Sequence, residues 1–226
     1  MQSLLFQTTY RFTTREDKAK YVWLKYKTIL KGKILDIGAD QGFLRSYLPE
    51  ESEYITVGLE PHHDVQIDLE KPIPIEDNSY DCVLCLDVLE HIENVHQLFD
   101  DLCRITRRYL VVSLPNAWRG FLGLLRYGYY SADRPMKFYN LPVDPPKDRH
   151  RWFFSPSEAR NFLETRGGRN GMEVLQADQI QPKFWKRAIY GFLLSLVIHK
   201  SIATSDLVDG TLWVVLEKKP NTTTPA

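Results

Sequence analysis

Two glycines and an acidic residue near the start of the chain have the spacing of a nucleoside-binding site. Gly38 and Gly42 lie in a turn that follows the apolar run at residues 34–37. A glycine turn between a strand and a helix lets a ligand lie against the backbone, because no Cβ stands in the way. Glu60 follows the next apolar run, at residues 54–59, close to the spacing of about 20 residues at which an acid holds a ribose diol. A carboxylate suits a diol because it accepts hydrogen bonds from both hydroxyls.

Cysteines are a second group of residue types that could do chemistry. Cys82 and Cys85 have the C-x-x-C spacing of metal and redox sites, and Cys103 is the third cysteine of the chain. The pair lies within an apolar run that reads as a strand, where side chains three apart point to opposite faces. We therefore expect buried core thiols, and the low, odd number of cysteines favours a reducing, cytoplasmic location.

Short apolar runs alternate with helical patterns along most of the chain. The run at residues 80–86 is nearly all apolar after Asp81, as expected for a central parallel strand. The alternation predicts an α/β fold with a doubly wound, mostly parallel, seven-stranded sheet and helices on both faces. Its ligand should lie beyond the carboxyl ends of the strands. We expect strands at residues 34–37, 54–59, 64–69, 80–86, 109–114, 173–180 and 211–217, with helices at residues 15–30, 43–48 and 95–108 and from residue 155 onward.

Two helix starts have specific sequence signals. Thr13 and Glu16 fit a capping box that opens the helix at residues 15–30, whose apolar stripe should pack on the sheet. Ser155 opens a later helix, which we expect to end at Gly167.

Composition limits the classes of function. Basic and acidic residues are both 29 among 226 residues, so no field-driven binding of nucleic acid is expected. The first six residues lack the basic region of a signal peptide, and no apolar run reaches the roughly 18 residues of a spanning helix. We expect a single domain over residues 1–226. Its parts are an amino-terminal helical segment (1–32), a ligand-binding core (33–116), a lid insertion on the acceptor side (117–154), and the carboxyl-terminal half of the sheet (155–220).

Residues 184–200 form an apolar segment that does not belong to the alternating pattern of strands and helices. Residues 188–198 carry no charged side chain, yet they are too few to cross a bilayer. Three interpretations remain open: a buried helix, a homodimer surface, or contact with a membrane surface.

The residues around the glycine turn resemble the class I S-adenosylmethionine-dependent methyltransferases, in their type 11 and 12 small-molecule branch. Residues 36–42 (DIGADQG) are similar to the first motif of that family, an acid followed by a G-x-G-x-G turn, with Asp40 in place of the middle glycine. Residues 77–92 resemble the stretch that carries the fourth strand past the methionine moiety, and residues 150–156 (HRWFFSP) match the approach to the next helix. The resemblance implies a Rossmann-like methyltransferase fold and S-adenosyl-L-methionine as cofactor.

The resemblance also implies roles for particular residues. Asp36 would lie under the turn, holding its N–H groups or facing the methionine ammonium. Glu60 would hold the ribose, and Leu86 and Asp87 would line the sulfonium side. The implied cofactor-binding residues are Asp36, Gly38, Gln41, Gly42, Glu60, Pro61, Asp68, Leu69, Leu86 and Asp87.

Two histidines are candidate general bases for an acceptor hydroxyl. His91 follows the fourth strand, and His150 lies beside the lid. Methyl transfer needs such a base only where the acceptor hydroxyl is poorly ionised. A packed or surface role remains the alternative for both. Asp87, Glu90 and His91 also resemble the metal-binding stretch of small-RNA 3′-end ribose methyltransferases, but we expect no metal.

We therefore expect an S-adenosylmethionine-dependent methyltransferase that acts on a small molecule with a hydrophobic part, more readily on oxygen than on nitrogen or carbon. One alternative is a cofactor-binding regulatory or partner module without turnover of its own. A nicotinamide-dependent oxidoreductase fits poorly, because the G-x-x-x-G spacing differs from the dinucleotide fingerprint.

Overall fold

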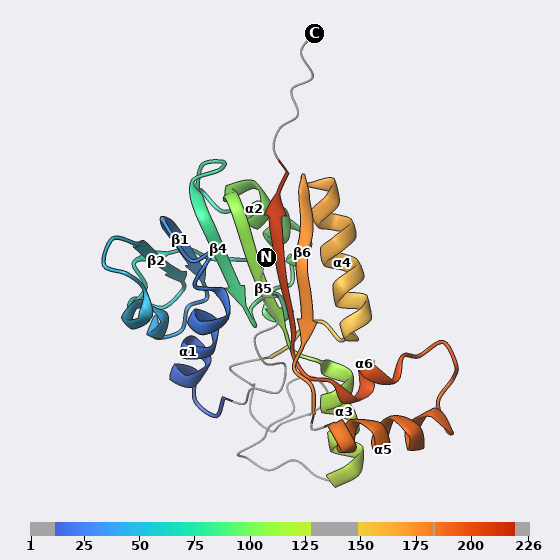
Figure 1. The fold of residues 1–226 in the computed structure, drawn as a ribbon. Coiled ribbons are helices and arrows are strands. Elements are labelled where there is room, and N and C mark those ends of the chain that lie inside the picture. Colours follow the sequence, from blue (N-terminus) through green and yellow to red (C-terminus); the bar gives the residue numbers. More distant parts are fainter. Residues whose placement is uncertain (1–11, 128–148, 183, 220–226) are drawn as a thin grey trace, which may run out of the picture.

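A computed structural model of the chain describes residues 12–127, 149–182 and 184–219 (Figure 1). Strands and helices alternate through the first half of the chain. The strands are β1 (Lys33–Ile37), β2 (Glu53–Gly58), β3 (Val65–Gln66), β4 (Tyr80–Leu86), β5 (Thr106–Leu114), β6 (Met172–Gln179) and β7 (Leu212–Lys218). The α-helices are α1 (Arg15–Tyr26), α2 (Val95–Ile105), α3 (Ala117–Tyr127), α4 (Pro156–Arg169), α5 (Phe184–Ser195) and α6 (Thr204–Val208), with short 3-10 turns η1 (Phe43–Tyr47) and η2 (Leu89–His91).

The strands form one sheet of seven in the order β3-β2-β1-β4-β5-β7-β6. Strands β1 to β5 pair in parallel, and β7 runs antiparallel between β5 and β6. The prediction of a doubly wound, mostly parallel seven-stranded sheet is confirmed. The carboxyl ends of β1, β4 and β5 consequently meet at one edge, where ligands bind in folds of this kind.

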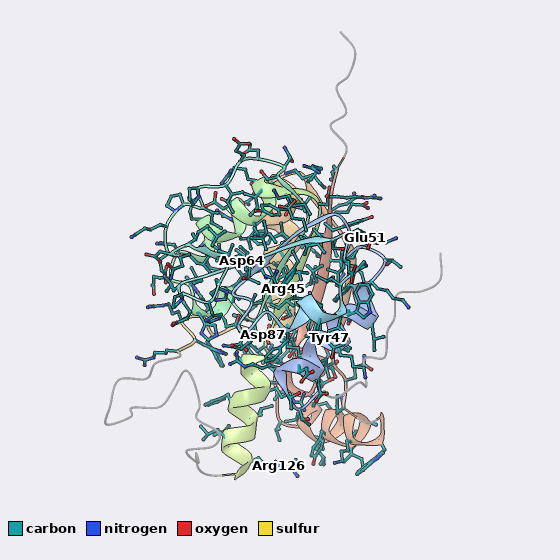
Figure 2. The ribbon with its side chains drawn as sticks, turned by 90° about the vertical axis from the view of Figure 1, so that its left-hand side faces the viewer. Arg45, Tyr47, Glu51, Asp64, Asp87 and Arg126 are labelled. Atoms are coloured by element: carbon teal, nitrogen blue, oxygen red, sulfur yellow. The ribbon has the colours of Figure 1, made fainter. Side chains whose placement is uncertain are left out.

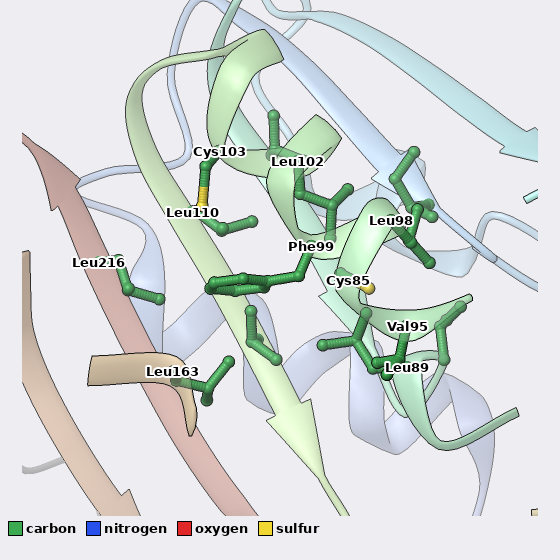
Figure 3. Close-up of a cluster of buried hydrophobic side chains, with 14 of the residues drawn as sticks. Cys85, Leu89, Val95, Leu98, Phe99, Leu102, Cys103, Leu110, Leu163 and Leu216 are labelled. Carbon is green, nitrogen blue, oxygen red and sulfur yellow. The ribbon is translucent and has the colours of Figure 1, made fainter. Parts of the chain in front are cut away.

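Each face of the sheet has its own buried core. On one face Phe99 of α2 packs with Leu163 of α4 and Leu216 of β7 (Figure 3). On the other face α1 packs through its apolar stripe against Trp213 and neighbouring strand residues. Cys85 belongs to the first core and Cys82 to the second, so the C-x-x-C pair does point to opposite faces as buried thiols.

The capping box of α1 lies one residue later than predicted. The Thr14 hydroxyl accepts a hydrogen bond from the backbone N–H of Asp17 at 3.0 Å, and the Asp17 carboxylate accepts from the Thr14 N–H at 3.3 Å. The helix also ends at Tyr26, before the predicted end at residue 30. α4 begins after Ser155 as predicted; Ser155 and Glu158 form a capping box that the sequence analysis did not identify, and the helix continues past Gly167 to Arg169.

Two predicted elements at the sheet edge are shorter than expected. β3 contains only Val65 and Gln66; at its start the Asp64 carboxylate accepts hydrogen bonds from the backbone N–H and hydroxyl of Thr56. The segment predicted as a helix at residues 43–48 is the single 3-10 turn η1.

The apolar segment at residues 184–200 is not a buried helix, so that interpretation is wrong. Large side chains of α5 and of the turn after it are exposed, among them Trp185, Phe192 and Val197. Within the described parts of the chain, no helix is both long and apolar enough to cross a bilayer. The predicted lid insertion is described only as α3 and residues 149–154; its remainder lies outside the described residues.

Candidate cofactor and active site

A cavity of about 650 Å³ lies at the carboxyl ends of β1 and β4, with α1 forming one wall. Its volume falls in the range of roughly 300–1,000 Å³ typical of small-molecule sites. The first strand and its turn, the end of β4, η2 and α1 all contribute side chains. They are Arg15, Lys18, Ala19, Val22, Asp36, Gly38, Ala39, Asp40, Phe43, Leu44, Leu86, Asp87, Val88, Glu90, His91, Pro115 and His150.

The turn after β1 has the backbone that its glycines predict. Gly38 and Gly42 have φ angles of 66° and 65°, in the left-handed region that favours glycine. A Cβ on Gly38 would lie 2.5 Å from a Val88 methyl group, so no larger residue fits without displacing Val88. Asp40 replaces the middle glycine of the motif and also has a positive φ, 50°. Aspartate tolerates this conformation better than most residues, so the turn keeps its shape.

Asp36 is the buried acid of the site. Its carboxylate accepts a hydrogen bond from the Tyr54 hydroxyl at 2.5 Å and lines the cavity. Burial raises the pKa of Asp36 to about 6, although the Tyr54 hydrogen bond and the nearby Lys18 act in the opposite direction. The carboxylate is therefore ionised at neutral pH and becomes neutral in mild acid.

Asp87 has a strained backbone at the end of β4, with a φ angle of 58°. Its carboxylate accepts from the Ser113 hydroxyl at 2.5 Å and lies 2.7 Å from the Lys18 ammonium. Burial acts to raise the pKa of Asp87, but Lys18 and Ser113 outweigh it, and the pKa is lowered. The ionised Asp87 carboxylate lies beside Leu86 in the cavity wall and gives the cavity a negative charge. Figure 2 shows Asp87 near the lower end of the sheet.

The sequence analysis missed the basic residues of α1. Arg15 forms an ion pair with Asp40 at 2.7 Å, and Lys18 pairs with Asp87. The single helix α1 therefore forms ion pairs with two of the acidic residues that line the cavity. Arg15, Lys18 and Val22 share a helix face, which the sequence does display. The packing of this helix face over the carboxyl edge of the sheet is a tertiary contact, and the sequence near α1 does not predict it.

Three predicted cofactor residues lie outside the cavity lining. Glu60 and Pro61 follow β2, and Gln41 lies in the glycine turn; all three are exposed and do not line the cavity. His62, beside them, bonds through its Nε2 to the Asp40 backbone oxygen at 2.5 Å. This contact ties the loop after β2 to the glycine turn.

Asp68 and Leu69, two further residues that the resemblance implies for cofactor binding, also lie outside the cavity lining. The Asp68 carboxylate accepts a hydrogen bond from the Glu70 N–H at 3.1 Å and pairs with Lys71 at 3.3 Å. Leu69 is 8% exposed and belongs to the core. The structure thus gives both residues contacts within the loop and the core.

The two candidate bases lie together, although they are far apart in sequence. The rings of His91 and His150 meet edge to face with centroids 4.6 Å apart, and both line the cavity. Glu90 is 1% exposed, and its Oε1 lies 3.9 Å from the His91 Nε2. One ligand atom from each of these three residues lies within 4.8 Å of the others, a spacing and donor set that could hold a divalent metal ion. Asp87, which the sequence grouped with Glu90 and His91, is not in this cluster.

A second cavity of about 200 Å³ shares Glu90 with the first. Its walls are largely apolar and come from η2, α2, the end of β5, the segment before α4 and the first two turns of α4. They include Leu89, Val95, His96, Leu114, Trp152, Phe154, Ala159 and Phe162. Residues 117–127, the described start of the predicted lid, line neither cavity.

Comparison with known proteins places these features in context. A protein-family profile described as a methyltransferase domain matches residues 7–170. A search of curated proteins gave no match. Among solved structures, an S-adenosylmethionine-dependent methyltransferase from Archaeoglobus fulgidus aligns with 15% identity and a TM-score of 0.59, over 91% of this chain and 95% of its own.

Two further solved structures show how widely this fold is used. The magnesium protoporphyrin IX methyltransferase of Synechocystis, solved with bound S-adenosylhomocysteine, aligns with 14% identity and a TM-score of 0.55, over 94% of this chain and 91% of its own. The [4+2]-cyclase SpnF aligns with 10% identity and a TM-score of 0.53, over 90% and 80%. At such identities the likeness is one of fold, and the chemistry has to be argued from the site.

Proposed function

Because the chain belongs to the methyltransferase-domain family and is a class I S-adenosylmethionine-dependent methyltransferase, we propose that it methylates a hydroxyl group of a small-molecule acceptor. The observation that carries this proposal is the shared cavity, whose walls include both the buried acid Asp36 and the paired imidazoles of His91 and His150. S-adenosylmethionine, when bound, supplies a methyl group on a sulfonium centre that is already activated for displacement.

The residues of the large cavity fit this cofactor. The glycine turn leaves room that a Cβ at Gly38 would fill, and the adjacent Asp36 carboxylate can pair with the methionine ammonium. We assign the methionine carboxylate to the cationic groups of Arg15 and Lys18, which the sequence did not suggest. Leu86 and Asp87 then lie on the sulfonium side.

The outer part of the cofactor is assigned to residues outside the cavity lining. Glu60 is exposed at the end of β2, so its carboxylate is accessible to a ribose diol from the edge of the cavity. The loop that contains Asp68 and Leu69 would face the adenine, with Gln41 and Pro61 flanking the sugar. These assignments follow the family motif.

Positioning supplies most of the rate in such a site. Holding the acceptor oxygen in line with the activated methyl group can contribute about 7–11 kcal/mol. His91 or His150 takes the proton of the acceptor hydroxyl as the oxygen–carbon bond forms. The carboxylate of the buried Glu90 lies beside His91, with its Oε1 3.9 Å from the His91 Nε2.

The small apolar cavity gives a place for the hydrophobic part of an acceptor. It borders the imidazole pair through Glu90, and aromatic side chains such as Trp152 and Phe162 form its walls. An acceptor with an aromatic or alkyl group would bury that group there and present its hydroxyl to the histidines.

The test is transfer of an isotope-labelled methyl group to a panel of phenols, sugars and hydroxylated lipids, with the product identified by NMR. We expect a methyl ether, and a fall in kcat of about 10²- to 10⁴-fold for His91→Ala or His150→Ala. S-adenosylhomocysteine affinity should stay unchanged in both variants, and His199→Ala, which lies outside both cavities, is the matched control. Methylation at nitrogen or carbon, or full activity of both variants, would refute the proposal.

Chelation separates proton transfer by histidine from metal-assisted transfer. Dialysis against EDTA should leave the rate unchanged if the imidazoles act directly as bases. A loss of activity that Mg²⁺, Mn²⁺ or Zn²⁺ restores would instead make Glu90, His91 and His150 a metal site.

A further inference from the structure

Three helices form a unit at the carboxyl edge of the sheet. Figure 1 shows α3, α5 and α6 together below the sheet, at the end toward which β4 and β5 point. α5 packs on α6, where Gly191 faces Thr204, and the Tyr190 hydroxyl of α5 accepts a hydrogen bond from Arg126 of α3 at 2.6 Å. The unit is connected to the carboxyl end of β5. Asn116, two residues after this strand, donates hydrogen bonds through its side-chain amide to the backbone oxygens of Asp206 and Asp209.

The outer face of α5 is apolar, although it faces solvent. Its large side chains recur at the spacing of one helix face and continue into the turn that follows, each between 51% and 79% exposed. They are Trp185, Ile189, Phe192, Leu193, Leu196 and Val197. The partly buried residues of the helix, such as Tyr190 and Leu194, lie on the opposite side. A contiguous apolar patch of this kind marks an interaction surface.

The charged side chains of α3, of α5 and of the turn after α5 are all basic. Residues 117–127 and 184–203 contain lysine and arginine but neither aspartate nor glutamate, in a chain whose formal net charge is zero. Lys186 is exposed beside Trp185, with its ammonium 5.3 Å from the ring centroid, and Lys200 is exposed beyond Val197. Arg126 lies near the free end of α3 (Figure 2). Basic residues flanking an apolar face complement a negatively charged, apolar partner.

We propose that the apolar face of α5 docks on the surface of a lipid bilayer that contains anionic lipids. The helix has 12 residues, too few to span the hydrocarbon, so it lies in the plane of the headgroups with its apolar side chains immersed. Lysines at both ends reach the lipid phosphates, and Trp185 suits the interface between water and hydrocarbon.

A second copy of the chain fits this face less well. Self-association through α5 would bring the Lys186, Lys200 and Arg126 side chains of two copies together with no acid in these segments to pair with them. Like charges brought together without compensation oppose a stable interface. An anionic lipid surface neutralises the same groups.

Docking would place the active site close to the bilayer. Pro115, which lines the large cavity, is followed directly by Asn116, whose amide joins α6. Resting on a membrane, the enzyme would reach an acceptor embedded in the lipid without releasing it into water. The lipid-binding proposal does not depend on methyl transfer, because it concerns a surface outside both cavities.

The experiment is co-sedimentation of the purified full chain with vesicles of phosphatidylcholine alone and of phosphatidylcholine with 30% phosphatidylglycerol. We expect at least tenfold tighter binding to the anionic vesicles, weakening as salt rises. The double variant Phe192→Glu with Leu196→Glu should lose at least tenfold in vesicle affinity. Leu175→Glu, a matched change at an exposed leucine of β6, should bind as the unaltered chain does.

Two readouts keep the test interpretable. S-adenosylhomocysteine affinity, unchanged in all variants, shows that each is folded and that cofactor binding is separate from lipid binding. Light scattering reports mass without lipid. Absent or charge-independent vesicle binding would overturn the proposal. So would a dimer that the Phe192→Glu, Leu196→Glu variant dissociates, because the face would then be a subunit interface.

Discussion

Asp36 links the buried chemistry of the site to a measurable pH dependence. Its pKa of about 6 in the folded protein means that the carboxylate form, which attracts the methionine ammonium, is present above that pH and lost below it. We therefore expect S-adenosylhomocysteine affinity to be constant above about pH 7 and to fall by up to about tenfold per unit below pH 6. Calorimetry between pH 5 and pH 8 measures this directly.

Two variants isolate Asp36 from the histidines of the same cavity. Asp36→Asn should bind more weakly and show a flatter pH profile over this range. Tyr54→Phe removes the hydrogen bond that stabilises the carboxylate, so the midpoint should move to higher pH. If Asp36→Asn keeps the full pH dependence, the ammonium contact belongs to another residue.

The sequence motif predicts that Glu60 binds the ribose, although Glu60 does not line the cavity. If it holds the ribose, Glu60→Ala should weaken S-adenosylhomocysteine binding by about 1.5–3 kcal/mol, the range for hydrogen bonds to a charged group. Glu51→Ala, a change at an exposed acid in the turn before β2, is the control. Equal affinities of the two variants in calorimetry would remove Glu60 from the site.

At the scale of elements, α1 is held to β6 by a buried ion pair. Lys25 is 2% exposed, its ammonium pairs with the Asp178 carboxylate, and the Tyr21, Tyr26 and Trp213 rings surround it. Burial lowers the pKa of Lys25, while the contact with Asp178 acts in the opposite direction. This pair fixes the helix that carries Arg15 and Lys18 into the cavity wall.

Breaking that pair should destabilise the fold measurably. Lys25→Met leaves the Asp178 carboxylate buried without its cation, and we expect the free energy of unfolding to fall by about 3–5 kcal/mol. Adding Asp178→Leu should recover much of the loss, because no uncompensated charge remains. Lys20→Met, on the exposed side of the same helix, should change it by less than about 0.5 kcal/mol. Chemical denaturation that finds Lys25→Met as stable as Lys20→Met would show that the pair does not anchor α1.

Local sequence patterns predicted most of the strands and helices but few of the tertiary contacts between them. The apolar run at Tyr80–Leu86 and the glycine turn gave the sheet and its ligand edge, because buried strands and left-handed turns have strong residue preferences. No residue preference in the sequence predicts that Glu90 and His150 lie close together. Their proximity depends on backbone contacts such as Arg151 N–H to the Glu90 oxygen, at 2.7 Å, between segments about 60 residues apart.

At the scale of the whole molecule, neutral net charge conceals an uneven distribution. The sequence correctly showed zero formal charge and an apolar segment at residues 184–200. A buried helix was one interpretation of that segment, because apolar content alone does not reveal on which side neighbours pack. The structure groups α5, whose outer face is apolar and whose charged residues are basic, with α3 and α6 at the carboxyl edge of the sheet, and it is this arrangement that suggests a membrane-facing end.

The most direct measurement is a crystal structure of the chain with bound S-adenosylhomocysteine. The account predicts the homocysteine end between Asp36 and the Gly38–Gly42 turn, within hydrogen-bond distance of Arg15 or Lys18. The ribose should lie at the Glu60 carboxylate and the sulfur should face His91 and His150. A ligand bound outside this cavity, or one whose sulfur points away from both histidines, would contradict it.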